Sequence, residues 1–469
     1  MTLWFDVTDL RHWGLGHLTG IQRTSVSVLA ELLTIRNDIE LFAFDSANKV
    51  LRKVDIHSLA PVIRDSLAST RGVNGDGQKT EPVSSCRQIT PVTGRARRQL
   101  KSAIRKKLKE LLGDEATDAL RETRRAFGNF LRAVRKQISM RIARTDRPFK
   151  IAGPVLFKKG DVCISLSATW GFQDYGEGLA AYKQASGAAY INLIYDLIPA
   201  LFPAWMPPHH SEVFTRWVTQ QIANSDLILT ISQFQKNEIA HFIETERLAS
   251  RSVEVIRLGD NPNMNSGLPV ELLPRPRYVP ERKFVICVST IDPRKNQGLL
   301  YRVWQRLVEE LGPDCPQLLL IGTPHPHVSD FLHQIRYDRS VNKVIVHLAD
   351  VSDEELAWYY KHCAFTIYPS IYEGWGLPIS ESLSLGRYCI AGNRTSLPEA
   401  GGDLVDYFDP FDFAACYKLV YRAVTDPDYV QAYEERIRTN YVPYSWAQTA
   451  AHISGIVDRL SDPDRGRVD

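Results

Sequence analysis

The sequence predicts an α/β protein built from two doubly wound parallel-sheet domains that face a cleft. Apolar, strand-like runs alternate with amphipathic helical runs twice along the chain. Its 469 residues exceed the length of one ordinary domain. The prolines of residues 260–282 indicate a linker between the two alternations. We therefore expect one domain over residues 1–270, a second over 283–440 and a final helical segment over 441–469.

The first domain is expected to open with a buried strand at Leu3–Val7, a glycine-rich turn and a helix near Ile21–Leu33. Such a turn can cradle phosphates, but the G-x-G-x-x-x-G spacing of residues 14–20 is one residue longer than the dinucleotide-binding fingerprint. Regular alternation stops after the second strand and returns near residue 161. The later elements are strands at Ile39–Phe44, Val162–Leu166, Ala189–Ile194, Leu227–Ile231 and Val253–Leu258, and helices near Glu177–Ala185, His209–Ala223 and Gln233–Ile243.

Residues 70–150 interrupt this alternation as an insert in the first domain. Residues 95–147 hold 17 Lys and Arg against 6 Asp and Glu, an excess of 11 positive charges in a chain whose net charge is +3. Apolar residues at helical spacing predict amphipathic helices with basic outer faces. Three interpretations compete for these helices: a solvated basic face, a nucleic-acid site, and contact with an anionic membrane surface.

The second domain repeats the alternation. Its strands are expected at Phe284–Ser289, Gln317–Ile321, Lys343–Leu348 and Ala364–Tyr368, with helices between them. Ligands of doubly wound sheets bind at the carboxyl ends of the strands. We therefore expect the functional residues in the segments that follow these strands.

One such segment, residues 372–381, joins a short buried strand to a helix that begins near Leu377. Gly374 and Gly376 would let the backbone approach a ligand closely, and Pro378 suits a first helical turn. The free N–H groups and the positive dipole end of this helix suit a phosphate. The carboxylates that flank the turn are Glu373 and Glu381.

Two further strand ends carry charged side chains. Arg294 and Lys295 follow the first strand of the second domain, where a guanidinium can grip two oxygens of a pyrophosphate and an ammonium adds a point charge. Asp196 follows a strand of the first domain and either orients an acceptor or pairs with a nearby loop. A lone Arg-Lys pair is usually a surface feature, but a strand-end position before a helix favours binding.

These segments together resemble glycosyltransferase family 4, whose members are retaining, nucleotide-sugar-dependent enzymes of the GT-B fold. Arg294-Lys295-Asn296 matches the R-K-N of that family. Residues 192–199 resemble its His-Asp-Leu-x-Pro segment, with Tyr195 where histidine is usual. The resemblance covers nearly the whole chain except residues 50–150 and is densest over 284–411. The residues that match its E-x7-E signature are Glu373, Gly374, Gly376, Leu377, Pro378 and Glu381.

The resemblance implies that the first domain is the acceptor side, that the second binds a nucleotide sugar, and that segment 441–469 crosses back. Glu381 would hold the ribose hydroxyls, Glu373 the transferred sugar, and Arg294 and Lys295 the leaving diphosphate, while the base packs near Val351. The catalytic residues implied are Arg294, Lys295, Glu373 and Asp196; the donor-binding residues are Gly20, Arg294, Lys295, Gly374, Trp375, Gly376, Leu377, Glu381 and Val351; and the acceptor or sugar pocket comprises Tyr195, Asp196 and Trp170.

The function expected from this resemblance is a retaining hexosyltransferase of bacterial surface-polysaccharide synthesis. A GDP- or dTDP-sugar is favoured as the donor, with UDP as a further option, and the acceptor is a glycan or a lipid-linked sugar. Tyr195 would shrink and dry the pocket for carbon 6, so a 6-deoxyhexose such as rhamnose or fucose is expected, with mannose next. The alternatives are a nucleotide-sugar epimerase and a non-catalytic binding protein, both on the GT-B frame.

Neither a metal nor another cofactor is expected. The D-x-D patterns at Asp426 and Asp462 indicate turns, and the paired histidines lack supporting ligands. Seven scattered cysteines without a C-x-x-C pair argue against a disulfide framework and for a reducing cytosol. Few aromatic residues lie among the basic residues of 95–147, so nucleic acid is not expected. We expect a cytoplasmic protein that this segment attaches peripherally to the inner face of the cytoplasmic membrane, with the solvated face as the alternative.

Overall fold

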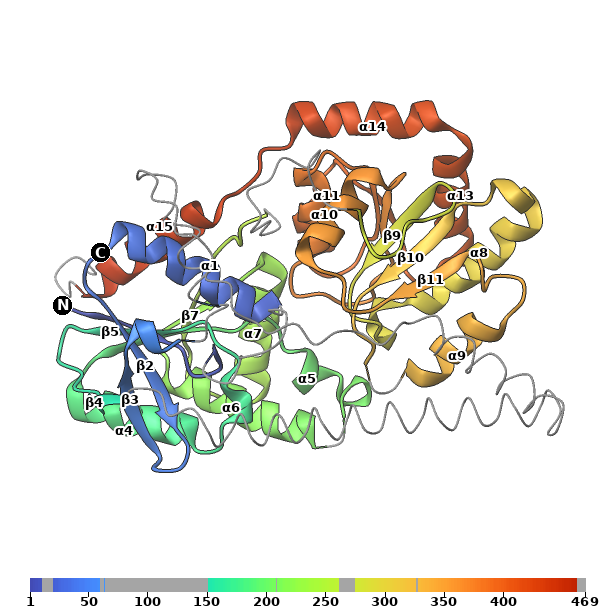
Figure 1. The fold of residues 1–469 in the computed structure, drawn as a ribbon. Helices are drawn as coiled ribbons and strands as arrows, with labels where there is room; N and C mark the ends of the chain where they lie inside the picture. Colours follow the sequence, from blue (N-terminus) through green and yellow to red (C-terminus); the bar gives the residue numbers. More distant parts are fainter. Residues whose placement is uncertain are drawn as a thin grey trace, which may run out of the picture. The chain divides into compact units, whose positions relative to one another are not determined.

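The computed structural model describes residues 1–10, 20–59, 63, 151–207, 209–260, 275–325 and 328–461 (Figure 1). For residues 151–153 it describes the backbone only. The basic segment 95–147, Gly14, Gly16 and most of the linker 260–282 lie outside these ranges. The expectations for those residues therefore stay predictions.

The first sheet has eight strands in the order β4-β3-β2-β1-β5-β6-β7-β8. The six strands from β2 to β8 in this order are parallel, and β1 lies between β2 and β5. This part of the sheet matches the strands predicted from the alternation. The bounds are β1 Leu3–Asp6, β2 Ile39–Asp45, β3 Val50–Val54, β4 Ile151–Pro154, β5 Val162–Ser165, β6 Ala189–Leu193, β7 Leu227–Thr230 and β8 Ser252–Val255.

One edge of the first sheet carries two antiparallel strands that were not predicted. Strand β3 pairs antiparallel with β2, and β4 pairs antiparallel with β3. An antiparallel strand can follow its partner after a short turn, without a helix between them. The alternation of strands and helices in the sequence therefore does not predict β3. The turn of residues 46–49 includes Lys49 at φ 53°, and the two edge strands extend the sheet beyond the doubly wound part.

Helices cover the first sheet and bury its apolar side chains. Trp4, Phe42 and Phe44 join Tyr175 and Leu179 of one helix in a single hydrophobic cluster. A second cluster unites residues of β7 with Phe214, Trp217 and Ile239 from two other helices. The helices are α1 Gly20–Ile35, α4 Tyr175–Ser186, α5 Ile198–Leu201, α6 His210–Asn224 and α7 Gln233–Thr245.

The second sheet has six parallel strands in the order β11-β10-β9-β12-β13-β14. Alternate residues of β9 enter two different cores, as the two-residue period of a strand requires. Val285 and Cys287 pack with Trp304, whereas Ile286 packs with Tyr359 and Tyr360. The bounds are β9 Phe284–Val288, β10 Gln317–Ile321, β11 Ile345–Leu348, β12 Thr366–Tyr368, β13 Cys389–Gly392 and β14 Asp406–Phe408.

The helices of the second half include one that packs on the first domain. Helix α15 lies beside α1 (Figure 1). Arg36 Nη1 donates to Ser454 Oγ at 2.9 Å and to Asp458 Oδ1 at 2.6 Å. The C-terminal helix therefore completes the surface of the first sheet. These helices are α8 Gln297–Leu311, α9 Ser329–Tyr337, α10 Asp353–His362, α11 Leu377–Ser384, α12 Leu397–Gly401, α13 Phe413–Thr425, α14 Pro427–Asn440 and α15 Trp446–Ser461.

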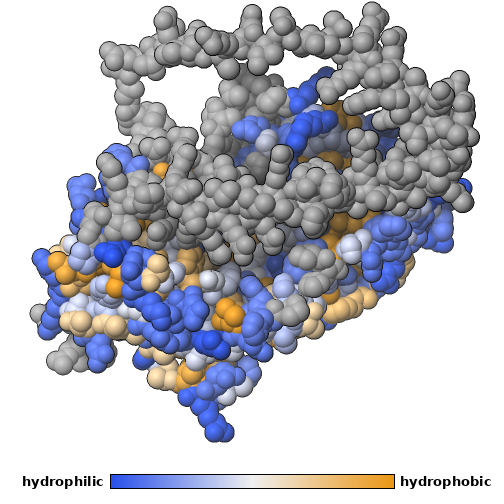
Figure 2. All heavy atoms as spheres, turned by 60° about the horizontal axis from the view of Figure 1, so that its bottom comes forward, coloured by the Kyte–Doolittle hydropathy of each residue, from blue (hydrophilic) through white to orange (hydrophobic). Residues whose placement is uncertain are grey.

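The surface of the described residues is mixed in polarity. Figure 2 shows one face, on which hydrophilic residues predominate and hydrophobic patches lie apart from one another. None of the helices in the described ranges is both long enough and apolar enough to cross a membrane. The six cysteines of these ranges are buried free thiols, as expected for small core residues.

Candidate functional site

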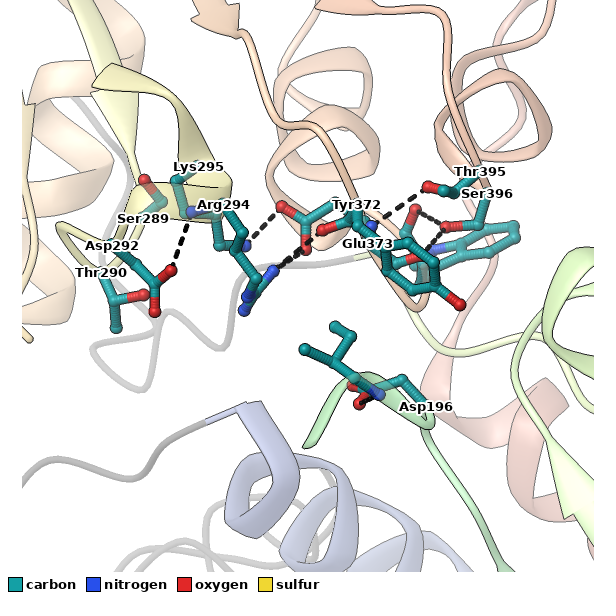
Figure 3. Close-up of polar contacts among 12 residues, drawn as sticks. Asp196, Ser289, Thr290, Asp292, Arg294, Lys295, Tyr372, Glu373, Thr395 and Ser396 are labelled. Carbon is teal, nitrogen blue, oxygen red and sulfur yellow. Dashed lines mark hydrogen bonds and ion pairs between the residues drawn. The ribbon is translucent and has the colours of Figure 1, made fainter. Parts of the chain in front are cut away.

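The candidate site gathers residues that follow strands of both sheets (Figure 3). Arg294 and Lys295 lie in η6, the 3-10 turn Pro293–Lys295 that follows β9. Glu373 lies in the loop between β12 and α11. Asp196 follows β6. The structure thus brings together the four residues expected to be catalytic.

Glu373 is bound by both cations. Arg294 Nη1 donates to Glu373 Oε2 at 2.9 Å, and Lys295 Nζ donates to Glu373 Oε1. Arg294 Nη1 also donates to the Tyr372 carbonyl at 3.0 Å. The three charged side chains are between 12% and 18% exposed. The cations are therefore held in place by protein groups and lie at the boundary of solvent.

Charge pairing controls the ionisation of this triad. Burial acts to raise the pKa of Glu373, but Lys295 and Arg294 outweigh it and lower that pKa to about 2. Burial and the neighbouring Arg294 lower the pKa of Lys295, against the pull of Glu373. Burial opposes the charge of Arg294 as well, yet Glu373 and other carboxylates raise its pKa. Glu373 is thus ionised at neutral pH, and an ionised triad carries one surplus positive charge.

Hydrogen bonds fix the loop that carries Glu373. Ser396 Oγ donates to the carbonyls of Glu373 and Trp375 at 2.9 and 2.7 Å. The Glu373 N–H donates to Thr395 Oγ1 at 3.1 Å. Figure 3 shows both side chains beside the loop. The sequence analysis did not identify Ser396 or Thr395, since they follow β13, for which no strand was predicted.

The Arg294–Lys295 turn is fixed at both ends. The Asp292 carboxylate accepts a hydrogen bond from the Arg294 N–H at 3.0 Å. Asn296 has φ 59°, and its side-chain amide donates to the carbonyls of Pro369 and Pro410. Asparagine tolerates this left-handed conformation better than most residues. The asparagine of the R-K-N segment therefore positions the two cations before it.

Gly374 permits a close approach of two loops. A Cβ atom at this position would lie 2.8 Å from the Tyr195 carbonyl oxygen and 3.3 Å from Asp196 Cβ. The sequence analysis expected Gly374 and Gly376 to admit a ligand. In the structure, the space that a side chain of Gly374 would fill is occupied by the segment that follows β6. The corresponding space at Gly376 is occupied by Leu397. The two glycines therefore allow protein segments to pack closely. Gly376 has a φ of 132° and directly precedes the first residue of α11.

Asp196 is buried against this loop. Its Oδ1 accepts a hydrogen bond from the Ile198 N–H at 3.0 Å, which forms the turn before α5. Burial raises the pKa of Asp196, although Arg294 acts in the opposite direction. The carboxyl group thus makes a structural turn and also lies within electrostatic range of the cations. The expected role of Asp196 toward an acceptor stays a prediction.

Tyr195 and Trp170 make contacts within the first domain. The Tyr195 hydroxyl donates to the Leu166 carbonyl at 2.9 Å. The Trp170 ring packs edge-on against Phe214 and Trp217, with centroids 5.5 and 5.4 Å apart. Trp170 therefore belongs to a hydrophobic cluster, and its place in an acceptor pocket stays a prediction.

Two side chains from other elements bind Glu381. Arg23 Nη1 donates to Glu381 Oε1 at 3.2 Å, and the Tyr360 hydroxyl donates to Glu381 Oε2 at 2.9 Å. The carboxylate is only 8% exposed, and burial raises its pKa despite both partners. Arg23 follows Gly20, where an added Cβ would lie 4.0 Å from Leu377 Cδ1. The start of α1 therefore lies against the start of α11.

Val351 and Trp375, both expected to bind the donor, have different surroundings. Val351 packs against the hydrophobic cluster that includes Tyr360. Arg23 also contacts Asp353, two residues beyond Val351, at 3.5 Å. The Trp375 side chain is 8% exposed, and its indole N–H has no hydrogen-bond partner among the described residues. This N–H is a buried donor that the described residues leave unpaired.

No group of three or more His, Cys, Asp or Glu in the described ranges is arranged to hold a metal ion. Asp426, part of one D-x-D pattern, accepts a hydrogen bond from the Tyr429 N–H and caps α14. Asp462 lies outside the described residues. The expectation that Asp426 belongs to a turn is confirmed.

Two curated relatives are mannosyltransferases of Escherichia coli. O-antigen chain mannosyltransferase B is 27% identical over 290 residues, which cover 59% of this chain and 73% of that protein. Serotype-specific mannosyltransferase WbdA is 24% identical over 288 residues, which cover 60% of this chain and 35% of the relative. The match thus spans about a third of WbdA.

Two solved structures share the fold over almost the whole chain. Anabaena Alr3699/HepE in complex with UDP and glucose has a TM-score of 0.56 at 12% identity, covering 98% of this chain and 100% of its own. Sucrose-phosphate synthase from Thermosynechococcus elongatus has a TM-score of 0.54 at 16% identity, covering 98% of both chains. The two parallel-sheet domains are those of the GT-B fold. Residues 274–440 match the family model described as glycosyl transferases group 1, and these likenesses together support a glycosyltransferase.

Proposed function

We propose that the protein is a retaining glycosyltransferase that moves a hexose from a nucleoside-diphosphate sugar to a glycan or lipid-linked acceptor in bacterial surface-polysaccharide synthesis. The observation that carries the proposal is the Arg294–Lys295–Glu373 triad at the strand ends, beside the start of α11. The names of the relatives, which are O-antigen and serotype-specific mannosyltransferases, support the choice of pathway.

In this proposal the cations act on the leaving group. The bond from the anomeric carbon to the diphosphate breaks, and negative charge builds up on the departing diphosphate oxygen. The acceptor hydroxyl oxygen bonds to the anomeric carbon, and its proton passes to the departing diphosphate. Arg294 and Lys295 stabilise that charge, with the positive dipole end of α11. The two hydrogen bonds of Arg294 described above leave from Nη1 alone. A guanidinium has five N–H donors, so it can bind phosphate oxygens as well.

The nucleoside would lie beyond the triad. Glu381 would accept hydrogen bonds from the ribose hydroxyls, sharing its oxygens with Arg23 and Tyr360. The base would pack near Val351, and the Trp375 indole N–H would donate to the donor molecule. Asp196 would orient the acceptor. All these groups are protein side chains, and the proposed chemistry is metal-independent.

Two features bear on the sugar. The relatives favour mannose, and GDP-mannose is the first donor to test. Tyr195 favours a 6-deoxyhexose instead, because its hydroxyl donates to Leu166 and its ring would face a methyl group better than a hydroxyl. The ratio of kcat/KM for GDP-mannose and GDP-rhamnose decides between them. A preference of about tenfold for mannose, or about 1.4 kcal/mol, rules out the 6-deoxyhexose.

Nucleotide binding comes first in testing the proposal. Thermal unfolding with GDP, dTDP, UDP and ADP identifies the base, since a ligand about a hundredfold above its Kd stabilises by about 2.7 kcal/mol. HepE, solved with UDP, is the reason to include that nucleotide alongside GDP and dTDP. Turnover of the donor without an acceptor would favour the epimerase. Tight binding without turnover over an acceptor panel would favour a binding protein.

A further inference from the structure

Four aromatic rings from three segments meet beside the candidate site. Phe202 stacks on Trp205, with centroids 4.5 Å apart and an interplanar angle of 22°. Tyr372 packs edge-on against Phe202 at 5.0 Å and against Phe234 at 5.6 Å. Phe202 and Trp205 belong to the segment of α5 and the 3-10 turn η4, Pro203–Trp205, whereas Phe234 lies in the first turn of α7. We call these four residues the aromatic ledge.

The ledge is only partly covered. Tyr372 is buried, while Phe202, Trp205 and Phe234 are partly exposed. The adjoining Leu201 is 37% exposed. Stacked rings at the surface leave apolar area for a partner to bury.

Prolines make the exposed part of the ledge rigid. Pro199 lies in the first turn of α5, and Pro203 begins η4. The Phe202 N–H donates to the Ile198 carbonyl at 2.9 Å, and the Trp205 N–H donates to the Phe202 carbonyl at 3.0 Å. A surface that is ordered before binding loses little freedom when a partner arrives.

The ledge adjoins the triad. Tyr372 directly precedes Glu373, and its carbonyl accepts a hydrogen bond from Arg294. Gln235 Nε2 donates to the Tyr372 hydroxyl at 3.4 Å and to the Glu373 carbonyl at 3.5 Å. The Tyr372 hydroxyl donates to Glu238 at 3.0 Å. The aromatic rings of the ledge are thus linked to Glu373 through hydrogen-bonding groups.

The charge around Phe202 and Trp205 limits the kind of partner. Residues 184–215 contain no lysine or arginine and two carboxylates, Asp196 and Glu212. The cations beside Tyr372, Arg294 and Lys295, are paired with Glu373. The segment that carries Phe202 and Trp205 adds no cation of its own for an anionic membrane surface or a nucleic acid. A neutral glycan does not. Its sugars present C–H groups with a small positive charge, which suit the negative face of an aromatic ring.

We propose that the aromatic ledge is an acceptor subsite that binds a pyranose of a neutral glycan chain, away from the hydroxyl that reacts. Trp205 and Phe202 supply the stacking surface, and Tyr372 joins it to the triad. The glycan's role as the acceptor rests on the proposed function. Binding of the glycan itself does not, because it needs neither donor nor transfer.

The test compares Trp205→Ala with Trp205→Phe, which keeps an aromatic ring, and with Phe411→Ala, which removes a 66% exposed ring of the second domain. The probes are α-linked tetrasaccharides of mannose and of rhamnose, titrated by calorimetry against the full-length protein. Trp205→Ala should raise the Kd of the bound probe about tenfold or more. Trp205→Phe and Phe411→Ala should stay within about threefold of the unaltered protein, and the thermal shift given by the bound nucleotide should be unchanged throughout.

Several results would overturn the subsite. They are equal Kd values for Trp205→Ala and the unaltered protein, no binding of either tetrasaccharide by the unaltered protein, or loss of the nucleotide response in Trp205→Ala. Binding to phosphatidylglycerol vesicles that depends on Trp205, without tetrasaccharide binding, would assign the ledge to a membrane instead. Tetrasaccharide binding that depends on Trp205, without transfer from any nucleotide sugar, would refute the glycosyltransferase and leave the subsite standing.

Discussion

At the scale of single residues, the carboxylates of the site differ in what holds them. Glu373 is bound by two cations of its own domain, which lower its pKa to about 2. Glu381 is bound by Arg23 of α1 and by Tyr360, and burial raises its pKa. The E-x7-E pattern alone does not distinguish these surroundings. Their difference assigns Glu373 to the cationic end of the site and Glu381 to the contact between α1 and α11.

The first prediction concerns Glu381. Glu381→Ala should lower kcat/KM about 10-fold to 100-fold, because each lost hydrogen bond to a charged group is worth about 1.5–3 kcal/mol. The matched control is Glu309→Ala, which removes a 69% exposed carboxylate of α8. Steady-state kinetics with the donor varied measure both. Equal kcat/KM in Glu381→Ala and the control, at matched thermal stability, would remove Glu381 from the donor site.

At the scale of elements, a buried polar cluster joins β1, β5 and α4. Asp6 accepts hydrogen bonds from the hydroxyls of Ser165 and Tyr175, at 2.7 and 2.6 Å, and from Thr8. Burial raises the pKa of Asp6 to about 6 despite these donors. At neutral pH the Asp6 carboxylate is therefore mostly ionised, and each of these hydrogen bonds stabilises its buried charge. This cluster fixes the strand end that leads into α1.

The second prediction follows from that dependence. Tyr175→Phe removes one donor from a buried carboxylate and should lower the free energy of unfolding by about 1–3 kcal/mol. The control is Tyr182→Phe, in the same helix, whose hydroxyl makes only a 3.5 Å contact with the Leu51 carbonyl. Urea unfolding at pH 7 compares the two variants. A loss in Tyr175→Phe no larger than in Tyr182→Phe would contradict this account of the cluster.

The elements also show what a sequence can and cannot predict. Most of the parallel strands were predicted because apolar runs and amphipathic periods are local signals. The parallel strands β13 and β14 were not predicted. Strands β3 and β4 were missed because a hairpin partner gives no helical signal, and β4 follows a long insert. Arg294, Lys295 and Glu373 were predicted to be site residues because strand ends mark sites in α/β folds. The pairing of Arg23 with Glu381 was not predicted, since the two residues lie 358 positions apart.

At the scale of the whole molecule, the basic segment 95–147 stands apart from the alternation that builds the two sheets. The third prediction is that deleting residues 72–149 leaves both sheets folded and abolishes binding to anionic vesicles. In the full-length protein that binding should weaken with salt, because exposed charges are screened. Vesicle sedimentation and circular dichroism measure the two effects. Equal vesicle binding by both proteins would contradict membrane attachment by this segment and favour a solvated basic face.

The central claim is that the triad serves sugar transfer, and acceptor-dependent release of nucleoside diphosphate tests it most directly. Release of GDP from GDP-mannose is measured with and without α-linked mannotetraose, in the unaltered protein, in Arg294→Ala and in Arg306→Ala, whose arginine is 54% exposed and pairs with Glu310. The account predicts release that requires the acceptor, reduced about a hundredfold or more in Arg294→Ala and unchanged in Arg306→Ala. Equal release with and without acceptor, or full activity in Arg294→Ala, would contradict it.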